Sequence, residues 1–306
     1  MDRSRFTSFF QLIRWQNLLF IAILLWVMER VVAKPLIALW NPITPLPWWV
    51  LTLLIVAVCS VAAAGYVIND YFDIKIDRIN RPDKVLVTTV FSKDDAMRIF
   101  YVLMALGIIT GAVVAWWAKS WTIGFIFPIV AGLLWFYSAS YKRQLLIGNL
   151  IVAFVSALVP MMILLLHMPY SGIWLPIYGG YALFAFLLTL VREITKDLQD
   201  QVGDRELECH SLPIVIGDTW TKVIVTALIL LSMTGLAYVG WFVPQLAEPW
   251  GAIQKYITLG ILVPLAGDIA LLWSAKIPSD YRSAQLLIKF VMFMGVMAAF
   301  VLKNYL

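Results

Sequence analysis

Long apolar runs, separated by short polar stretches, constrain this chain more than any other feature of its sequence. A run of about 20 apolar residues is long enough to cross the hydrocarbon core of a bilayer as a helix. Hydrophobic residues make up 62% of the chain and charged residues only 13%, so a soluble core is a poor competitor. We therefore expect an all-α, polytopic membrane bundle of about nine transmembrane helices. The expected spans are 17–33, 48–68, 97–117, 120–140, 145–166, 173–191, 220–243, 256–275 and 284–303.

The basic residues are distributed unevenly among the segments that join the expected spans. If the N-terminus is cytoplasmic, most of the 23 Lys and Arg residues fall on cytoplasmic segments. Because such segments of membrane proteins are enriched in Lys and Arg, we expect this orientation in an inner or plasma membrane. The net charge of +5 then reflects topology, and we expect no nucleic-acid partner.

Two acidic motifs of matched spacing follow two of the expected spans and would lie on the cytoplasmic face. They read Asp70-x2-Asp73-x3-Asp77-Arg78 and Asp197-x2-Asp200-x3-Asp204-Arg205. On a helix, positions i, i+3 and i+7 lie on nearly the same side, so each motif would form an acidic stripe. Such a stripe repels itself unless a cation lies between its carboxylates. The pair predicts a metal site shared by two repeat halves, about 1–144 and 145–306, of one membrane domain spanning 1–306.

Carboxylates beside lipid favour magnesium and a diphosphate substrate. Mg²⁺ prefers hard oxygen ligands and commonly bridges protein carboxylates to substrate phosphates. Two acidic helices, each holding one ion, would clamp a diphosphate and stabilise the charge on leaving pyrophosphate. Basic residues near the motifs fit the same ligand, namely Arg78, Arg81, Lys84, Lys142, Arg143, Arg192 and Lys196. A polyprenyl diphosphate satisfies both requirements, because it joins a diphosphate to a long apolar tail.

Two longer segments around these motifs resemble the signatures of a known family. They are Asn69-Asp70-Tyr71-Phe72-Asp73-x3-Asp77-Arg78-x2-Arg81-Pro82 and Arg192-Glu193-x2-Lys196-Asp197-x2-Asp200-x2-Gly203-Asp204. Both resemble signatures of the UbiA-type intramembrane prenyltransferase superfamily. Further matches are Tyr137 and Lys142 near the end of the fourth span and Arg14 and Asn17 near the first. The resemblance covers essentially the whole chain and implies Mg²⁺-dependent transfer of a prenyl group to a lipophilic acceptor in isoprenoid lipid biosynthesis.

The resemblance also implies a role for each matching residue. The metal ligands would be Asn69, Asp70, Asp73, Asp77, Asp197, Asp200 and Asp204. Four of these, Asp70, Asp73, Asp200 and Asp204, would act in catalysis by helping the allylic C–O bond to ionise. Substrate contacts would come from Arg14, Asn17, Arg78, Arg81, Lys84, Tyr137, Lys142, Arg192 and Lys196. For Asp197 two roles stay open, since it is either a metal ligand or a residue that orients Lys196 and the acceptor.

The residues around the second motif indicate which acceptor receives the prenyl group. Together with 211–214, Gly217 and 79–84, they most resemble geranylgeranylglycerol-phosphate geranylgeranyltransferases. Many family members with aromatic acceptors carry Tyr-Ala where Lys196-Asp197 stand, so the extra charge suits an acceptor with a phosphate. One departure is the stretch 85–88, which replaces the usual proline and small residues. The alternative acceptor is an aromatic precursor of a quinone or of haem.

Two other classes of membrane protein use acidic motifs. A CDP-alcohol phosphotransferase needs glycine directly after its second aspartate, whereas Ile74 follows Asp73 here. A cation transporter usually places its acidic sites near mid-membrane on broken helices, whereas these motifs lie at span ends beside basic residues. The transporter remains the alternative from outside the enzymes.

Overall fold

The computed structural model describes residues 4–39, 44–169, 172–242 and 251–305, and within these ranges the regular structure is helical. In chain order the elements are α1 (Arg5–Leu12), α2 (Trp15–Val27), η1 (Met28–Ala33), α3 (Lys34–Leu39), α4 (Trp48–Phe72), α5 (Ile74–Asn80), η2 (Pro82–Lys84), α6 (Lys93–Ala118), α7 (Trp121–Ala139), η3 (Tyr141–Arg143), α8 (Ile147–Leu166), α9 (Trp174–Glu206), α10 (Leu212–Ile216), α11 (Asp218–Phe242), α12 (Ala252–Ile257), η4 (Thr258–Leu262), α13 (Val263–Ser274) and α14 (Tyr281–Leu302). The predicted all-α membrane bundle is confirmed, with eight described helical spans long and apolar enough to cross a bilayer.

The first expected span, 17–33, differs from the prediction. Its residues lie in α2, which is 13 residues long, and in η1, a π-helical turn of six residues. The apolar run is shortened because η1 carries the charged side chains of Glu29 and Arg30. The other expected spans coincide with candidate spans of the structure, and the span expected at 256–275 is made of α12, η4 and α13. Residue 243, the expected end of one span, lies outside the described residues.

The chain forms two compact units. Unit 1 comprises Met1–Trp26, Leu46–Ile151 and Val202–Cys209, and unit 2 comprises Val27–Pro45, Val152–Gln201 and His210–Leu306. Neither unit is one continuous stretch of chain, because α2 and α9 each contribute residues to both. The predicted repeat relation between residues 1–144 and 145–306 remains a prediction.

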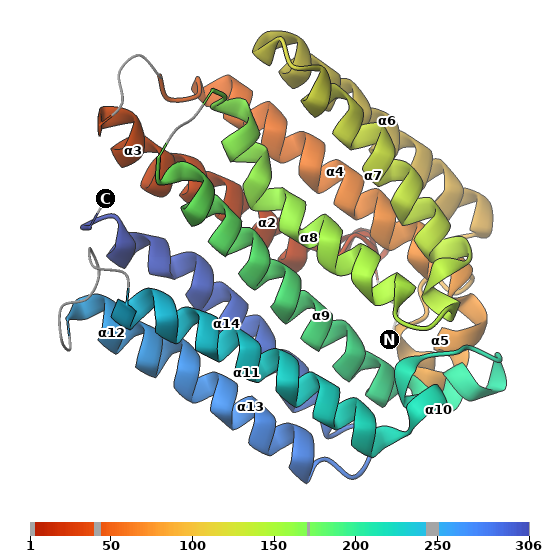
Figure 1. Ribbon diagram of the computed structural model, residues 1–306. Coiled ribbons are helices and arrows are strands. Elements are labelled where there is room, and N and C mark those ends of the chain that lie inside the picture. The colour runs from red at the N-terminus through yellow and green to blue at the C-terminus, as the bar shows by residue number, and fades with distance from the viewer. Residues whose placement is uncertain (1–3, 40–43, 170–171, 243–250, 306) are drawn as a thin grey trace. The chain divides into compact units, whose positions relative to one another are not determined.

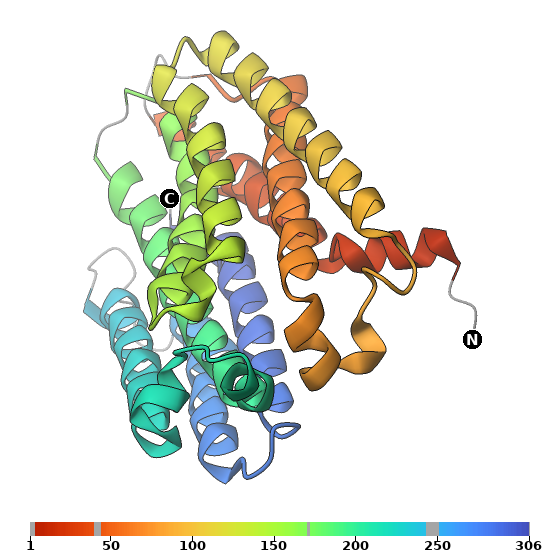
Figure 2. The same cartoon turned by 90° about the vertical axis from the view of Figure 1, so that its right-hand side faces the viewer.

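In unit 1, α4, α6 and α7 lie side by side (Figure 1). Glycines allow this close approach, because small residues let helix backbones come together in a membrane bundle. A Cβ atom on Gly107 of α6 would lie 2.6 Å from Cγ2 of Val61 in α4. One on Gly111 would lie 2.4 Å from the ring of Phe127 in α7. The packing fixes α4, and α5 turns away from its end (Figure 2).

In unit 2, α11, α12, α13 and α14 pack together. A buried polar pair also ties η1 to the end of α8, since Nε2 of His167 lies 2.8 Å from Oε2 of Glu29. Both side chains are almost completely buried, and the hydrogen bond satisfies groups that would otherwise be costly to bury. The Tyr178 hydroxyl donates to the Met28 carbonyl at 2.8 Å and holds η1 against α9.

Candidate active site

The first acidic motif spans the junction between α4 and α5. Asp70 lies in the last turn of α4, and Asp73 separates the two helices with φ −87° and ψ 3°. Backbone hydrogen bonds continue through the bend, from the Asp73 amide to the Asn69 carbonyl at 2.9 Å and from the Asp77 amide to the Asp73 carbonyl at 2.8 Å. The first motif therefore does not lie on one uninterrupted helix, as its predicted acidic stripe assumed, because the helix bends at its central aspartate.

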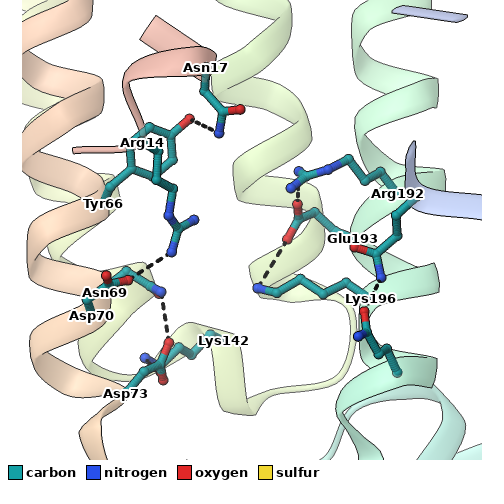
Figure 3. Close-up of polar contacts among 12 residues, drawn as sticks. Arg14, Asn17, Tyr66, Asn69, Asp70, Asp73, Lys142, Arg192, Glu193 and Lys196 are labelled. Atoms are coloured by element: carbon teal, nitrogen blue, oxygen red, sulfur yellow. Dashed lines mark hydrogen bonds and ion pairs between the residues drawn. The ribbon is translucent and has the colours of Figure 1, made fainter. Parts of the chain in front are cut away.

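Asp70 faces a cation from the N-terminal segment. Nη2 of Arg14 lies 2.8 Å from Oδ1 of Asp70, and the guanidinium carbon lies 4.7 Å from the centre of the Tyr66 ring (Figure 3). Arg14 joins α1 to α2 with a φ of 51°, which turns the chain sharply. Asn17 donates from Nδ2 to the Tyr66 hydroxyl at 3.2 Å. Two predicted substrate contacts, Arg14 and Asn17, thus converge on Tyr66, one turn before Asp70.

Asp73 faces a second cation, from the turn that follows α7. Lys142, in η3, donates to Oδ1 of Asp73, and Asn69 donates from Nδ2 to the other carboxylate oxygen at 2.8 Å (Figure 3). The side chains of Asp73 and Lys142 are each 14% exposed, which strengthens their attraction relative to a surface pair. The amide oxygen of Asn69 is buried and accepts no hydrogen bond from the residues that the structure describes.

The unusual stretch after the first motif forms a tight, largely buried loop. Val85, Leu86 and Val87 are buried, and the Phe91 amide donates to the Leu86 carbonyl at 3.1 Å. The Arg78 guanidinium donates to the Thr88 hydroxyl at 3.0 Å, so this loop anchors a predicted phosphate contact. The apolar residues that replace the usual proline and small residues thus supply the packing of the loop.

The second acidic motif lies entirely within α9, a helix of 33 residues. Asp197, Asp200 and Asp204 are three and four residues apart on one continuous helix, so the predicted acidic stripe is confirmed for this motif. The motif continues from an apolar helix, and its last aspartate lies two residues before the end of α9.

The end of α9 belongs to unit 1 and contacts the end of α5. The Gly203 amide donates to Oδ1 of Asn80 at 2.8 Å, beside the buried Asp204. The Cys209 amide donates to the Asp204 carbonyl at 2.9 Å. Burial raises the pKa of the Cys209 thiol, and the Asp204 carboxylate adds to this shift, so the thiol stays protonated at neutral pH.

The basic residues before the second motif share one buried carboxylate in unit 2. Oε1 of Glu193 lies 2.5 Å from Nη1 of Arg192, and its Oε2 lies 3.9 Å from Nζ of Lys196 (Figure 3). Lys196 lies three residues after Glu193 on α9, so helix spacing places these two side chains on the same side, and Arg192 is the sequence neighbour of Glu193. The result is a charge cluster with two cations and one anion.

The other predicted contacts lie around the same segments of unit 1. Tyr137 lies near the end of α7, where a Cβ atom on Gly148 would approach its ring to 3.1 Å. Arg81 separates α5 from η2, and Lys84 ends η2. Both residues therefore follow the first motif closely in the chain.

The acidic residues do not form a metal site by themselves. Among the residues that the structure describes, no three His, Cys, Asp or Glu side chains are grouped closely enough to hold a metal ion. The chemistry of the donors nevertheless suits Mg²⁺, since the buried, unpartnered amide oxygen of Asn69 lies beside the carboxylates of the first motif.

Sequence reasoning missed three residues that organise these contacts. Tyr66 supports Arg14, Asn80 binds the backbone of α9, and Glu193 links two basic side chains. Asn80 and Glu193 stand inside the quoted motifs, so their position was a usable signal. Tyr66 lies four residues before Asp70, on the same side of α4, and could have been found by helical spacing.

Curated relatives are identical to this chain at about a third of the aligned positions. One is the digeranylgeranylglyceryl phosphate synthase of Ignicoccus hospitalis, 31% identical over 79% of this chain and 78% of the relative. Another is the digeranylgeranylglyceryl phosphate synthase of Thermococcus kodakarensis, 32% identical over 77% of this chain and 79% of the relative.

Solved structures share the fold at lower sequence identity. A structure of digeranylgeranylglyceryl phosphate synthase has a TM-score of 0.65 at 22% identity and covers 97% of this chain and 99% of its own. A UbiA homologue from Archaeoglobus fulgidus bound to GPP and Mg²⁺ has a TM-score of 0.61 at 17% identity and covers 96% and 99%. The sequence pattern of the UbiA prenyltransferase family matches residues 31–297. This chain therefore belongs to the UbiA prenyltransferase family and is an integral-membrane prenyltransferase.

Proposed function

We propose that the protein transfers a geranylgeranyl group from geranylgeranyl diphosphate to geranylgeranylglycerol phosphate, releases diphosphate, and carries its acidic motifs on the cytoplasmic face. Two relatives named digeranylgeranylglyceryl phosphate synthase, each covering more than three quarters of the chain, support this acceptor. The basic cluster before the second motif also supports it, because a phosphate-bearing acceptor needs cations. The uneven distribution of Lys and Arg supports the orientation.

The first motif would bind the prenyl diphosphate. Asn69, Asp70 and Asp73 offer the oxygen donors that Mg²⁺ prefers, and a UbiA homologue of the same fold is described as bound to GPP and Mg²⁺. When bound, Mg²⁺ supplies positive charge that stabilises the leaving diphosphate. Arg14 and Lys142, which already lie against Asp70 and Asp73, would contact the diphosphate oxygens from two sides.

The buried amide oxygen of Asn69 is the observation that carries this assignment. Its Nδ2 group donates to Asp73, which fixes the amide so that the oxygen points away from that carboxylate. A buried polar atom without a partner costs about 1–3 kcal/mol, and a cation ligand would remove that cost. An amide oxygen also adds no negative charge to a motif that already holds three aspartates.

The second motif would bind Mg²⁺ and orient the acceptor. Asp200 and Asp204 would provide further oxygen ligands, and Asp197 would either join them or orient Lys196. Arg192 and Lys196 would bind the acceptor phosphate, with Glu193 holding both side chains in place. The acceptor hydroxyl would then form the ether bond to the prenyl carbon as the allylic C–O bond breaks, and its proton would be released.

A single incubation tests both the reaction and the acceptor. Purified protein receives labelled geranylgeranyl diphosphate, Mg²⁺ and a mixture of geranylgeranylglycerol phosphate, hydroxybenzoate and naphthoate acceptors. We expect one product with the mass of the doubly prenylated glycerol phosphate. Product only from an aromatic acceptor would overturn the proposed acceptor but keep prenyl transfer. Metal-dependent ion flux in proteoliposomes without any prenyl transfer would overturn the proposal altogether.

A further inference from the structure

Asn80 joins the end of the first motif segment to the end of the second. Its Oδ1 atom accepts a hydrogen bond from the Gly203 amide at 2.8 Å, although the two residues are 123 positions apart in the chain. Both residues lie in unit 1, so the contact is internal to one compact body. Asn80 is the last residue of α5, and Gly203 directly precedes Asp204 in α9.

The contact with Asn80 accounts for the glycine at position 203. Inside a helix, glycine is less favourable than alanine by roughly 0.5–1 kcal/mol. A Cβ atom on Gly203 would lie 2.6 Å from Nδ2 and 2.8 Å from Oδ1 of Asn80, which is too close for any real contact. The bare backbone of Gly203 therefore allows the Asn80 amide to reach the helix.

The neighbours of both residues are proposed ligands of the diphosphate site. Asp77 lies three residues before Asn80 and donates its amide to the Asp73 carbonyl at 2.8 Å. Asp204 is buried next to Gly203. Since α5 is only seven residues long and bends away from α4, it needs a contact at its far end to hold a fixed direction.

We infer that Asn80 is a positioning residue, which holds Asp77 and Asp204 at the spacing that the metal–diphosphate complex requires. This inference rests on the proposed function, because it assumes that both aspartates belong to that site. Residues that orient metal ligands through one hydrogen bond typically change metal affinity or activity by roughly 10–100-fold when they are removed.

Three variants separate positioning from general stability. Asn80→Ala removes the acceptor of the Gly203 amide, and Gly203→Ala displaces Asn80 from the opposite side. The double variant Asn80→Ala, Gly203→Ala removes the side chain with which the new methyl group would collide. Gly180→Ala is the matched control in the same helix, because a Cβ atom there meets nothing within 4 Å.

The readout is binding of Mn²⁺ with inorganic diphosphate, followed by electron paramagnetic resonance, with thermal unfolding of each variant measured in the same detergent. We expect each single substitution to weaken binding by roughly 10–100-fold, as loss of an orienting contact does. The double variant should bind no worse than the weaker single variant, because both substitutions break one contact. Gly180→Ala should bind like the unaltered protein.

Several outcomes would overturn the inference. If Asn80→Ala binds Mn²⁺ and diphosphate normally, or if the two single effects simply add, Asn80 does not act through Gly203. A fall in unfolding temperature at unchanged affinity would assign Asn80 a structural role alone. Failure of the proposed function looks different, because the unaltered protein would then bind no Mn²⁺ with diphosphate, or Asp204→Asn would bind it as well as the unaltered protein.

Discussion

The two acidic motifs share a spacing but are organised differently. The first bends at Asp73, and its carboxylates are paired with Arg14 and Lys142, which come from segments far away in the sequence. The second follows one straight helix, and the basic residues before it are linked by Glu193 within a single turn. Tertiary packing therefore brings the cations that pair with the first motif, whereas the charged neighbours of the second motif lie beside it on the same helix.

This difference matches the proposed reaction, in which the first motif binds the diphosphate and the residues before the second bind the acceptor phosphate. A diphosphate carries several negative charges and is best bound by groups that converge from different directions. An acceptor phosphate at the edge of the site can be held by neighbours on one helix.

Removing one carboxylate from either motif should abolish transfer. Asp70→Asn and Asp200→Asn each remove a proposed metal ligand, so we expect kcat for prenyl transfer to fall by about 10³-fold. Turnover is measured with labelled geranylgeranyl diphosphate at saturating Mg²⁺. The exposed Asp83, in the turn after the first motif, gives the control Asp83→Asn, which should retain normal turnover. Near-normal turnover in only one of the two variants would show that the motifs do not share the metal chemistry.

Loss of a long-range cation should affect the first motif alone. Lys142→Met leaves the mostly buried Asp73 without its cationic partner and removes a proposed diphosphate contact, so kcat/KM for the prenyl diphosphate should fall by roughly 10–100-fold. The exposed Lys75 lies in α5, close to the same motif, and Lys75→Met is the matched control. An equal loss in both variants would mean that general positive charge, and not the pairing with Asp73, is what matters.

Loss of a cation beside the second motif should affect the acceptor. Lys196→Ala should raise KM for geranylgeranylglycerol phosphate about tenfold, because a charge-assisted hydrogen bond contributes ~1.5 kcal/mol. The KM for the prenyl diphosphate should stay unchanged, and so should the rate with a glycerol lipid that lacks the phosphate. Parallel changes for both substrates would place Lys196 at the diphosphate instead.

Asp280 lies outside both motifs, so its substitution shows what the loss of an aspartate with no part in the proposed reaction does to stability and transfer. The Asp280 carboxylate accepts hydrogen bonds from the amides of Lys276 at 2.9 Å and Ile277 at 3.2 Å, and these bonds lower its pKa below the usual 3.8. Because the pKa is lower in the folded protein, its stabilising effect is present above about pH 4 and is lost as the pH falls below that value.

Asp280→Ala should therefore lower the unfolding temperature at pH 7 by about 1 °C, as expected for a surface change, and leave transfer normal. The difference from the unaltered protein should shrink as the pH falls below about 4. Thermal unfolding across this pH range is the measurement, and a difference that grows on acidification would contradict the assignment.

The sequence predicted the helical class and the second motif well because both follow from local periodicity. Apolar runs of membrane length and a spacing of three and four residues are visible in one stretch of chain. The bend at Asp73 and the π-helical turn η1 were missed, since both depend on partners elsewhere. Glu29, for example, is tolerated in η1 because His167, 138 positions away, binds it.

The long-range contacts of the site could not be predicted for the same reason. Nothing near Asp73 indicates that Lys142 would lie against it, and the family resemblance named Lys142 without naming its partner. Asn80 and Gly203 both stand inside the quoted segments, but only the folded chain brings them together.

The length of α9 has a consequence for how the two products leave. At a rise of about 1.5 Å per residue, its 33 residues extend ~50 Å, whereas the hydrocarbon layer is only ~30 Å thick. Its apolar turns can therefore remain among lipid tails while its acidic turns stand in water. The two products of a reaction at that boundary separate spontaneously, because diphosphate dissolves in the aqueous phase and the two-tailed ether remains in the lipid phase.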